Sequence, residues 1–306
     1  MKAYPTDLSE FGIESHWRRN APSTRRLLVV YAHPDDESFG NAGTLATYGR
    51  AGVDVHYVTA TRGECGGVAP ELLEGYADIG ALRTAEQGRA AEALDLASYH
   101  FLGYRDSGMP GTPDNDHPRA TVQAPPEEVA ARVTAAIRAI QPQVVITFGP
   151  YGGYGHPDHI AMHHATLRAF HAAGDPAAFP EQLERGLFAW TPRKLYYSTF
   201  RTGMLKVGLL AMRLFGKDPT RGGQNGDIDF LRVMAEVTPT TASVRCRDVL
   251  AQKDLAWQAH RSQLGGMGAV LRVPRFLRRP FTSAECFTRA VPPPNGKPET
   301  DLFAGV

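Results

Sequence analysis

The sequence has few cysteines, and they are too far apart in the chain to suggest a disulfide framework. Of its 306 residues three are cysteine, and none lies in a CxxC pair. A disulfide scaffold and a structural zinc knuckle are therefore not expected. Reduced thiols in a cytoplasmic protein fit this pattern best. The cysteines are Cys65, Cys246 and Cys286.

Long apolar runs are also missing. The nearest, Met204 to Phe215, contains Lys206 and Arg213 and is shorter than the ~20 residues that cross a bilayer. The stretch 1–19 carries acids and prolines without an apolar segment, so it does not resemble a secretory signal. We expect no membrane span.

The chain has no excess of charge of either sign. Lys and Arg number 33 against 32 Asp and Glu, and the formal net charge is +1. No global field therefore favours nucleic acid or an anionic membrane, and no nucleic-acid partner is expected. A local basic patch at Arg275, Arg278 and Arg279 is expected to be solvated surface.

Short apolar runs alternate with helical patterns through the first half of the chain. Such alternation predicts an α/β fold: a Rossmann-like, mostly parallel sheet with helices on both faces, whose ligand site lies beyond the carboxyl ends of the strands. The predicted strands are 27–32, 53–61, 99–104, 144–148 and 195–199. The predicted helices are 39–51, 77–96, 126–140, 159–173, 204–215 and 249–263.

The domain organisation follows from where this alternation is clear. We expect an N-terminal arm at 1–24, a Rossmann-like catalytic core at 25–175, and a C-terminal extension at 176–306 that completes the pocket and packs on the core as one domain. Within the extension, 204–215 is predicted to be an amphipathic helix that packs on the core or covers the site; its apolar residues at helical spacing and its two cations leave association with a membrane surface as the alternative. Residues 217–229 are predicted to form a loop, and the tail from Pro292, rich in Pro and Gly, is expected to be loosely held.

The first polar cluster is Ala32-His33-Pro34-Asp35-Asp36-Glu37, at the end of the first strand. A turn that begins a helix brings positions i and i+3 together, so His33 and Asp36 could point at one centre while Asp35 points elsewhere. The alternative is an acidic helix N-terminus, with these carboxylates favoured by the helix dipole.

The second cluster, Gly155-His156-Pro157-Asp158-His159, repeats the i, i+3 spacing after the strand at 144–148. Both clusters follow apolar strands, where a doubly wound sheet places its ligand site. Two imidazoles, one carboxylate and an open position form a common hydrolytic zinc site. The two clusters together favour a metal centre over two acidic helix ends.

Other features are weaker. His163, His164 and His171 are expected on a helix surface or behind the site, since the HExxH glutamate is absent, and His56 is expected to be structural. A sugar- or nucleotide-binding module on a Rossmann-like sheet, without catalysis, is the competing class. HPDDE rather than GxGxxG follows the first strand, and acids there would repel a pyrophosphate.

At these residues the sequence resembles the LmbE-like, or PIG-L, family of zinc-dependent N-deacetylases. The resemblance covers about residues 25–265. It is most similar to the N-acetylglucosaminyl deacetylases of mycothiol or bacillithiol biosynthesis. The matching segments are AHPDDE at 32–37, TRGE at 61–64, RDSGM at 105–109, YGGYGHPDH at 151–159 and Lys253 with HRSQ at 260–263.

The resemblance implies a role for each matched residue. His33, Asp36 and His159 would bind zinc, and Asp35 would be the general base. His156 would be the general acid or stabilise the oxyanion. The remaining implied roles are Asp158 orienting His156, Tyr154 polarising the acetyl carbonyl, and Arg83 and Asp106 holding the sugar or its aglycone.

The implied activity is zinc-dependent hydrolysis of the acetamide of a small N-acetylglucosamine-containing glycoside. The alternatives are an amidase of thiol S-conjugates and a deacetylase of chitooligosaccharides or other glycoconjugates. Fe2+ or another divalent ion could replace zinc in such a site. The sequence leaves open the aglycone, the oligomeric state, the part played by 200–230 and that of Cys65, which is expected near the rim of the site.

Overall fold

One mixed sheet crosses the computed structural model, which describes residues 4, 7–19, 22–223, 226–265 and 267–306. Its strand order is β1-β4-β3-β2-β5-β6-β8-β7. The pairs from β4 to β6 are parallel, whereas β1 on β4, β8 on β6 and β7 on β8 are antiparallel. The described strands are β1 (Glu14–Trp17), β2 (Arg26–Tyr31), β3 (Asp54–Thr59), β4 (Ser98–Phe101), β5 (Val144–Phe148), β6 (Lys194–Thr199), β7 (Ala242–Arg245) and β8 (Ala284–Val291).

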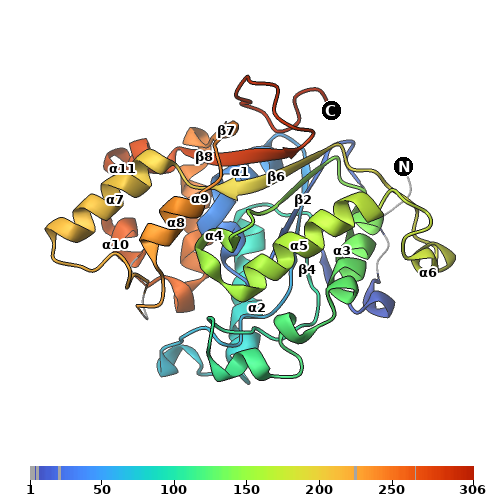
Figure 1. Cartoon of the computed structure of the whole chain (residues 1–306), viewed down its shortest axis with the longest axis horizontal. Coiled ribbons are helices and arrows are strands. Elements are labelled where there is room, and N and C mark those ends of the chain that lie inside the picture. Colours follow the sequence, from blue (N-terminus) through green and yellow to red (C-terminus); the bar gives the residue numbers. More distant parts are fainter. Residues whose placement is uncertain (1–3, 5–6, 20–21, 224–225, 266) are drawn as a thin grey trace.

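Helices cover both faces of the sheet (Figure 1). Helix α3 packs on α5, and α9 packs on both α1 and α2. None of the helices that the structure describes is long and apolar enough to cross a bilayer. The described α-helices are α1 (Asp36–Arg50), α2 (Ile79–Ala93), α3 (Pro126–Ile140), α4 (Gly152–Gly155), α5 (Pro157–Ala172), α6 (Pro180–Glu184), α7 (Thr202–Leu214), α8 (Phe230–Glu236), α9 (Leu250–Ala259), α10 (Met267–Arg272) and α11 (Arg275–Thr282).

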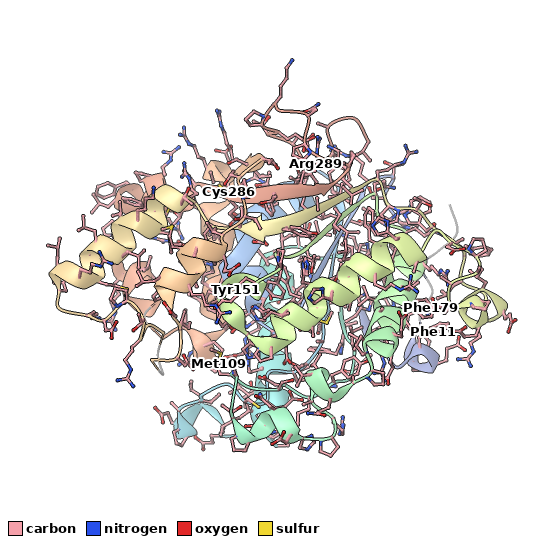
Figure 2. The ribbon with its side chains drawn as sticks, viewed as in Figure 1. Phe11, Met109, Tyr151, Phe179, Cys286 and Arg289 are labelled. Carbon is pink, nitrogen blue, oxygen red and sulfur yellow. The ribbon has the colours of Figure 1, made fainter. Side chains whose placement is uncertain are left out.

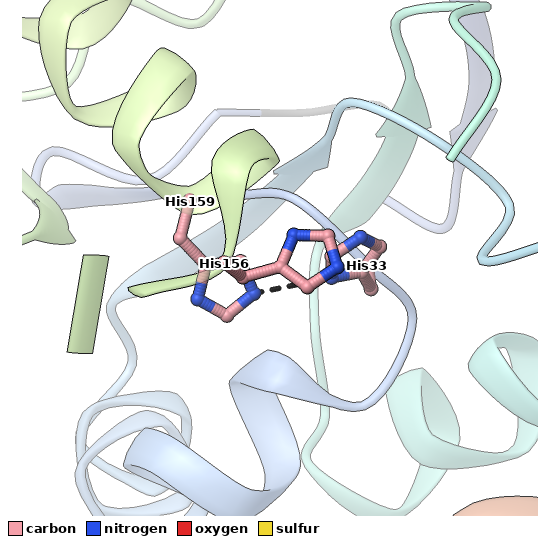
Figure 3. Close-up of side chains that lie close together, drawn as sticks. All are labelled: His33, His156 and His159. Carbon is pink, nitrogen blue, oxygen red and sulfur yellow. Dashed lines mark hydrogen bonds between the residues drawn. The ribbon is translucent and has the colours of Figure 1, made fainter. Parts of the chain in front are cut away.

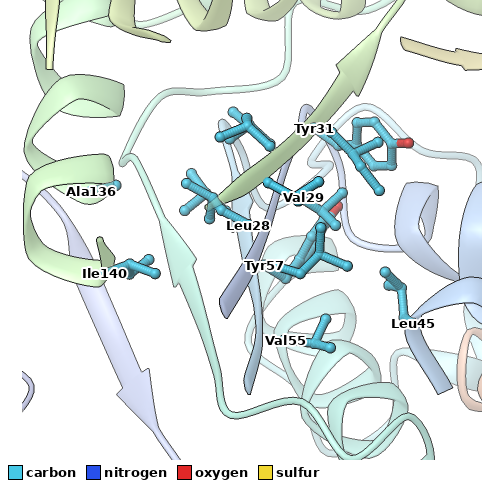
Figure 4. Packing of buried hydrophobic residues seen from close by; sticks show 14 of the residues in the cluster. Leu28, Val29, Tyr31, Leu45, Val55, Tyr57, Ala136 and Ile140 are labelled. Carbon is cyan, nitrogen blue, oxygen red and sulfur yellow. The ribbon is translucent and has the colours of Figure 1, made fainter. Parts of the chain in front are cut away.

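The core lies around the central strands, and Figure 4 shows Leu28, Val29 and Tyr57 packed between the helices. Every residue of β2, β3 and β5 is buried. These strands show no in–out alternation because helices cover both of their faces. The expected mostly parallel α/β sheet is confirmed.

The topology fixes where a ligand site should lie. Strand β2 pairs with β3 on one side and with β5 on the other, so the chain order reverses between β2 and β5. In an open parallel sheet, such a reversal leaves a crevice beyond the carboxyl ends of the two strands. The two polar clusters follow these two strands.

The chain termini differ from expectation. Part of the predicted arm forms β1, which pairs with β4, although 1–3, 5–6 and 20–21 lie outside the described residues. The prediction of a loose tail is wrong. Glu299 lies 2.7 Å from Lys194 Nζ and 2.6 Å from Arg289 Nη1, and Leu302 is fully buried. Figure 2 labels Arg289 on β8. A few well-placed side chains fix a segment whose composition suggests mobility. Strands from all three predicted segments, 1–24, 25–175 and 176–306, belong to this one sheet. The division into these segments remains a prediction.

Two predictions about the C-terminal half also need correction. Arg278 is not solvated surface, because it is buried and forms a two-pronged ion pair with Asp254, which Arg275 also contacts. Helix α7 forms as expected, but none of its residues is buried. The predicted loop at 217–229 includes residues 224–225, outside the described residues, and holds an isolated bridge between Gly222 and Ile228.

Candidate metal centre and active site

The ends of β2 and β5 bring three side chains to one point. His33 Nδ1 lies 3.1 Å from His159 Nε2 (Figure 3). Asp36 Oδ2 lies 3.5 Å from His33 Nδ1, and Asp36 Oδ1 lies 3.4 Å from His159 Nε2. The turn after β2 and the start of α5 therefore deliver two imidazole nitrogens and one carboxylate to a common centre.

The hydrogen bonds behind these side chains fix which ring nitrogen faces the centre. His159 Nδ1 lies 2.9 Å from the carbonyl oxygen of Gly152, to which it donates, so its Nε2 keeps a free lone pair. His33 Nε2 lies 3.3 Å from Asp158 Oδ2 and 3.4 Å from Asp106 Oδ1. A proton on that nitrogen leaves the Nδ1 lone pair of His33 facing the centre. Such partners orient metal-binding histidines in general.

The spacing of these atoms fits a small divalent ion. A tetrahedral zinc ion with Zn–N distances of about 2.0–2.1 Å holds its ligand atoms roughly 3.3–3.4 Å apart. Burial alone would lower the pKa of His33, but Asp106, Asp158 and Asp36 raise it well above the ordinary value. Carboxylates that stabilise a proton on His33 would equally stabilise a bound cation. Two further groups could hold an ion: His33 with His156 and His159, and His33 with Asp106 and Asp158.

Asp35 lies beside this centre in an unusual backbone conformation. Its φ is +115°, which is strained for a residue with a side chain. Burial raises the pKa of Asp35 to about 7, against the opposing charge of Arg83. Arg83 Nη2 donates to Asp35 Oδ2 at 2.9 Å. The carboxylate is thus held away from Asp36, and it lines the cavity in front of the centre.

His156 is held by a backbone hydrogen bond at one ring nitrogen and faces a carboxylate with the other, since its Nε2 lies 3.9 Å from Asp106 Oδ1. Its Nδ1 accepts a hydrogen bond from the N–H of Asp158 at 3.2 Å, so the ring proton sits on Nε2. Burial, His33 and His159 lower the pKa of His156 well below its ordinary value. The Asp158 carboxylate instead faces His33 and accepts from the N–H of Ser107 at 3.0 Å. The residue predicted to orient His156 does so through its main chain.

A cavity of about 220 Å³ opens in front of the centre. Tyr154 lies on its wall, with its ring 4.9 Å from that of His159 in an edge-to-face contact. Arg83 and Asp106 also line it, as predicted for substrate contacts, although both are engaged by protein groups. Asp106 Oδ1 accepts from the N–H of Gly108 at 2.9 Å, besides facing His33.

Two residues of the cavity have no signal in the sequence: Asp227 and Ile228, which come from the loop between α7 and α8. Met109, which also lines the cavity, belongs to the RDSGM segment. Cys65 lies on the rim as expected; burial and Asp106 raise its pKa to about 12, so it stays a thiol. A larger hollow of about 560 Å³, lined by Trp190 and Arg193 among others, lies away from both clusters.

Glu37 and His260 form a buried pair behind the first cluster, and neither of them was assigned a role from the sequence. Glu37 Oε1 lies 3.0 Å from His260 Nε2, and both residues are fully buried. Glu37 Oε2 accepts from the N–H of Asp35 at 3.1 Å. The last residue of AHPDDE and the first of HRSQ therefore meet behind the strained turn. That both residues belong to segments matching the family was the one sequence feature that could have pointed to a role for them.

The other histidines take positions outside the centre. His163 is buried and its Nδ1 lies 2.9 Å from the carbonyl oxygen of Phe148, whose ring stacks on His159 at 3.9 Å. His163 therefore stands behind the site, whereas His164 and His171 are exposed. His56 is buried within β3, in agreement with a structural role.

The fold and the site define a class of protein: a Rossmann-like α/β protein with a His–Asp–His centre at the switch point of its sheet. The family model described as PIG-L, GlcNAc-PI de-N-acetylase, matches residues 28–170. The chain belongs to this family of deacetylases, which makes it a hydrolase of amide bonds.

Curated relatives match nearly the whole chain. One from Geodermatophilus obscurus is 38% identical over 295 residues and covers 92% of this chain and 98% of its own length. One from Rhodococcus erythropolis is 38% identical over 299 residues, with 93% and 98% covered. Both are named 1D-myo-inositol 2-acetamido-2-deoxy-alpha-D-glucopyranoside deacetylase.

Among solved structures, the fold is similar to that of N,N'-diacetylchitobiose deacetylase from Pyrococcus horikoshii. The TM-score is 0.59 at 20% identity, with 87% of this chain and 83% of that chain covered. At this identity the likeness concerns the fold alone.

Proposed function

We propose that the chain is a zinc-dependent N-deacetylase that hydrolyses the acetamide of a small N-acetylglucosamine glycoside and releases acetate. The observation that carries the proposal is the convergence of His33, Asp36 and His159 beside a carboxylate, Asp35, that is not part of the donor set. The relatives named above act on an inositol glycoside of N-acetylglucosamine, which makes this glycoside the first candidate substrate.

The donor set suits zinc, and His33, Asp36 and His159 would hold it. When bound, zinc supplies Lewis acidity, which makes water a stronger nucleophile at neutral pH and the amide carbonyl a better electrophile. Asp35 accepts the proton of the attacking water. Its strained turn and its contact with Arg83 aim the carboxylate into the cavity in advance of the reaction.

His156 stabilises the oxyanion of the tetrahedral adduct through its Nε2–H. A second ring proton would place an N–H of His156 against the N–H of Asp158, two donors facing each other. The neutral ring therefore suits hydrogen-bond donation better than proton donation. Asp35, protonated in the first step, then passes that proton to the departing amine.

Tyr154 adds a second donor to the acetyl carbonyl. Burial raises the pKa of its phenol above the ordinary value, so the hydroxyl keeps its proton. Arg83 and Asp106 line the remaining wall and contact the sugar hydroxyls or the aglycone. The cavity of about 220 Å³ is below the usual ~300–1,000 Å³ of ligand sites, which favours a small polar substrate.

The test is amine release, detected with fluorescamine, from four compounds: N-acetylglucosamine, its inositol and malate glycosides, and diacetylchitobiose. Each is assayed as purified, after chelation, and after adding back Zn2+ or, without oxygen, Fe2+. We expect chelator-sensitive release from the inositol glycoside, restored by Zn2+.

Other outcomes decide between the alternatives. Preferred release from diacetylchitobiose would move the substrate to chitooligosaccharides. Release only from a thiol S-conjugate would identify an amidase. Release that a chelator does not affect, or that only Fe2+ restores, would overturn the assignment of zinc.

A further inference from the structure

Helix α7 presents apolar side chains to solvent instead of to the core. Val207, Leu210 and Leu214 are 62%, 59% and 76% exposed. Their i, i+3, i+7 spacing places them on one face of the helix. Phe215, at the end of α7, is 80% exposed. In a packed amphipathic helix this face is the buried one.

A second element exposes the same kind of side chains. In α11, Phe276, Leu277 and Phe281 are 73%, 54% and 54% exposed. Figure 1 shows α7, α10 and α11 at the same end of the molecule. We call the exposed apolar residues of α7 and α11 the apolar end surface. It consists of Val207, Leu210, Leu214, Phe215, Phe276, Leu277 and Phe281.

The charged side chains within the two segments that carry this surface are all positive. Neither 201–217 nor 255–284 contains an aspartate or a glutamate. On α7, Lys206 and Arg213 are exposed and lie one helical turn to either side of Leu210. Arg272 and Arg279 are exposed beside the apolar residues of α11. The near-zero net charge of the whole chain therefore hides a basic region.

The ion pairs of α11 set this region apart from ordinary surface. Arg278 and Arg275 bind the carboxylate of Asp254 on α9, which holds α11 against the body of the molecule. The apolar side chains of α11 are thus presented by a fixed helix.

Exposed apolar side chains on helices whose only charged residues are cations match the surface of an anionic bilayer. The apolar groups enter the boundary between headgroups and acyl chains, and the cations meet lipid phosphates. A second copy of this chain, joined through the same surface, would bring cations against cations. We propose that the apolar end surface docks the protein reversibly on an anionic phospholipid membrane.

The docking surface is connected to the active site through one loop. Asp227 and Ile228 follow α7 and line the cavity, and α8, which follows them, contacts both α4 and α7. Docking through α7 would therefore bring α8, and the segment before it that supplies two cavity residues, close to the membrane. The proposal concerns location at a surface, and it does not depend on which glycoside is hydrolysed.

The experiment is co-sedimentation of the full chain with vesicles of phosphatidylcholine alone or mixed with phosphatidylglycerol. We expect at least about tenfold more bound protein on the anionic vesicles, lost in high salt, since each cation near the surface adds about 1 kcal/mol. The variant Val207→Ser/Leu210→Ser/Leu214→Ser should not bind. The variant Lys206→Gln/Arg213→Gln should lose the preference for anionic lipid.

A matched variant, Val207→Leu/Leu210→Met/Leu214→Met, keeps the apolar face and should bind like the parent. Equal binding by the serine variant, or no binding by the parent, overturns the proposal. Light scattering without vesicles tests the other occupant: a dimer that the serine variant dissolves would assign the surface to a second copy and likewise overturn the proposal.

Discussion

Among the residues that the structure describes, buried histidines form two clusters, and one of them has the surroundings that suit a cation. His33, His156 and His159 gather beyond the strand ends, whereas His56 and His100 lie within β3 and β4. In both clusters, burial raises the free energy of a positively charged imidazole. Carboxylates raise the pKa of His33, but burial and Arg26 lower the pKa of His56 to about 3.

In the second cluster both imidazoles are hydrogen-bonded to hydroxyl groups, and the carboxylate at its end, Asp54, is paired with Arg19. Tyr4 donates to Asp54 at 2.9 Å and contacts His56 Nε2 at 3.0 Å. Ser98 Oγ bridges His56 and His100 at 2.7 and 2.6 Å. Each imidazole can use one donor and one acceptor without a net charge. The comparison teaches that carboxylate partners and position at the strand ends, rather than burial or residue type, distinguish the candidate metal centre.

The largest effect that tests this contrast should come from His159→Ala. Loss of one of three donors should reduce bound zinc to near zero and deacetylation below detection, because the two remaining side chains form an incomplete site. Metal content by mass spectrometry and amine release measure the two effects. The counterpart His100→Asn should keep zinc and activity; if it lost zinc as well, the two clusters would not be independent.

Next in size is Asp35→Asn. The amide cannot accept the proton of water, so kcat should fall by about 10²–10⁴-fold. The bound zinc should remain, because Asp35 lies outside the His33–Asp36–His159 set. Turnover and metal content are measured on the same sample. Retained turnover, or zinc lost in parallel with it, would contradict the assignment of Asp35 as the base.

A smaller effect is expected for Glu37→Gln. The new amide would bring an N–H₂ group either to the N–H of Asp35 or to His260, where Glu37 now accepts hydrogen bonds. The strained turn should relax, and kcat should fall about tenfold with KM and zinc unchanged, since small misplacements of a catalytic group are costly. Glu86→Gln is the matched control, because Glu86 bonds Ser262 in the same C-terminal segment. A similar loss of kcat in that control would mean general destabilisation.

The elements that could be predicted are those determined by local sequence patterns. The runs at β2 and β5 are continuous and apolar, and α3 was predicted with its observed bounds. The position of both polar clusters follows from the parallel sheet. Strand β1, with sequence ESHW, has no buried residue and is defined by its pairing with β4, which no local pattern encodes.

The unpredicted parts depend on contacts between distant residues. The direction of the Asp158 carboxylate toward His33 depends on a contact across 125 positions. The packing of the tail depends on Glu299 meeting Lys194 and Arg289. The cavity residues Asp227 and Ile228 come from a loop without a motif. Composition predicted a mobile tail and a solvent-exposed Arg278. Both predictions were wrong because amino-acid composition carries no information about which distant residues a side chain contacts.

The pH dependence of stability sharpens the contrast at the second cluster. The pKa of His56 is about 3 in the folded chain, against an ordinary value of 6.5 for a solvated histidine, so the unfolded chain takes up the proton first as pH falls. Stability from this group is therefore fully present above pH 6.5 and is lost toward pH 3, by up to about 1.4 kcal/mol per pH unit. Urea unfolding at pH 7.0, 6.0 and 5.5 should show this fall.

His56→Asn should be less stable at pH 7.0, having lost hydrogen bonds worth about 1–3 kcal/mol, but its stability should fall less steeply as the pH is lowered. Parallel curves for parent and variant would mean that folding leaves the pKa of His56 at its ordinary value, and this difference between the two clusters would disappear.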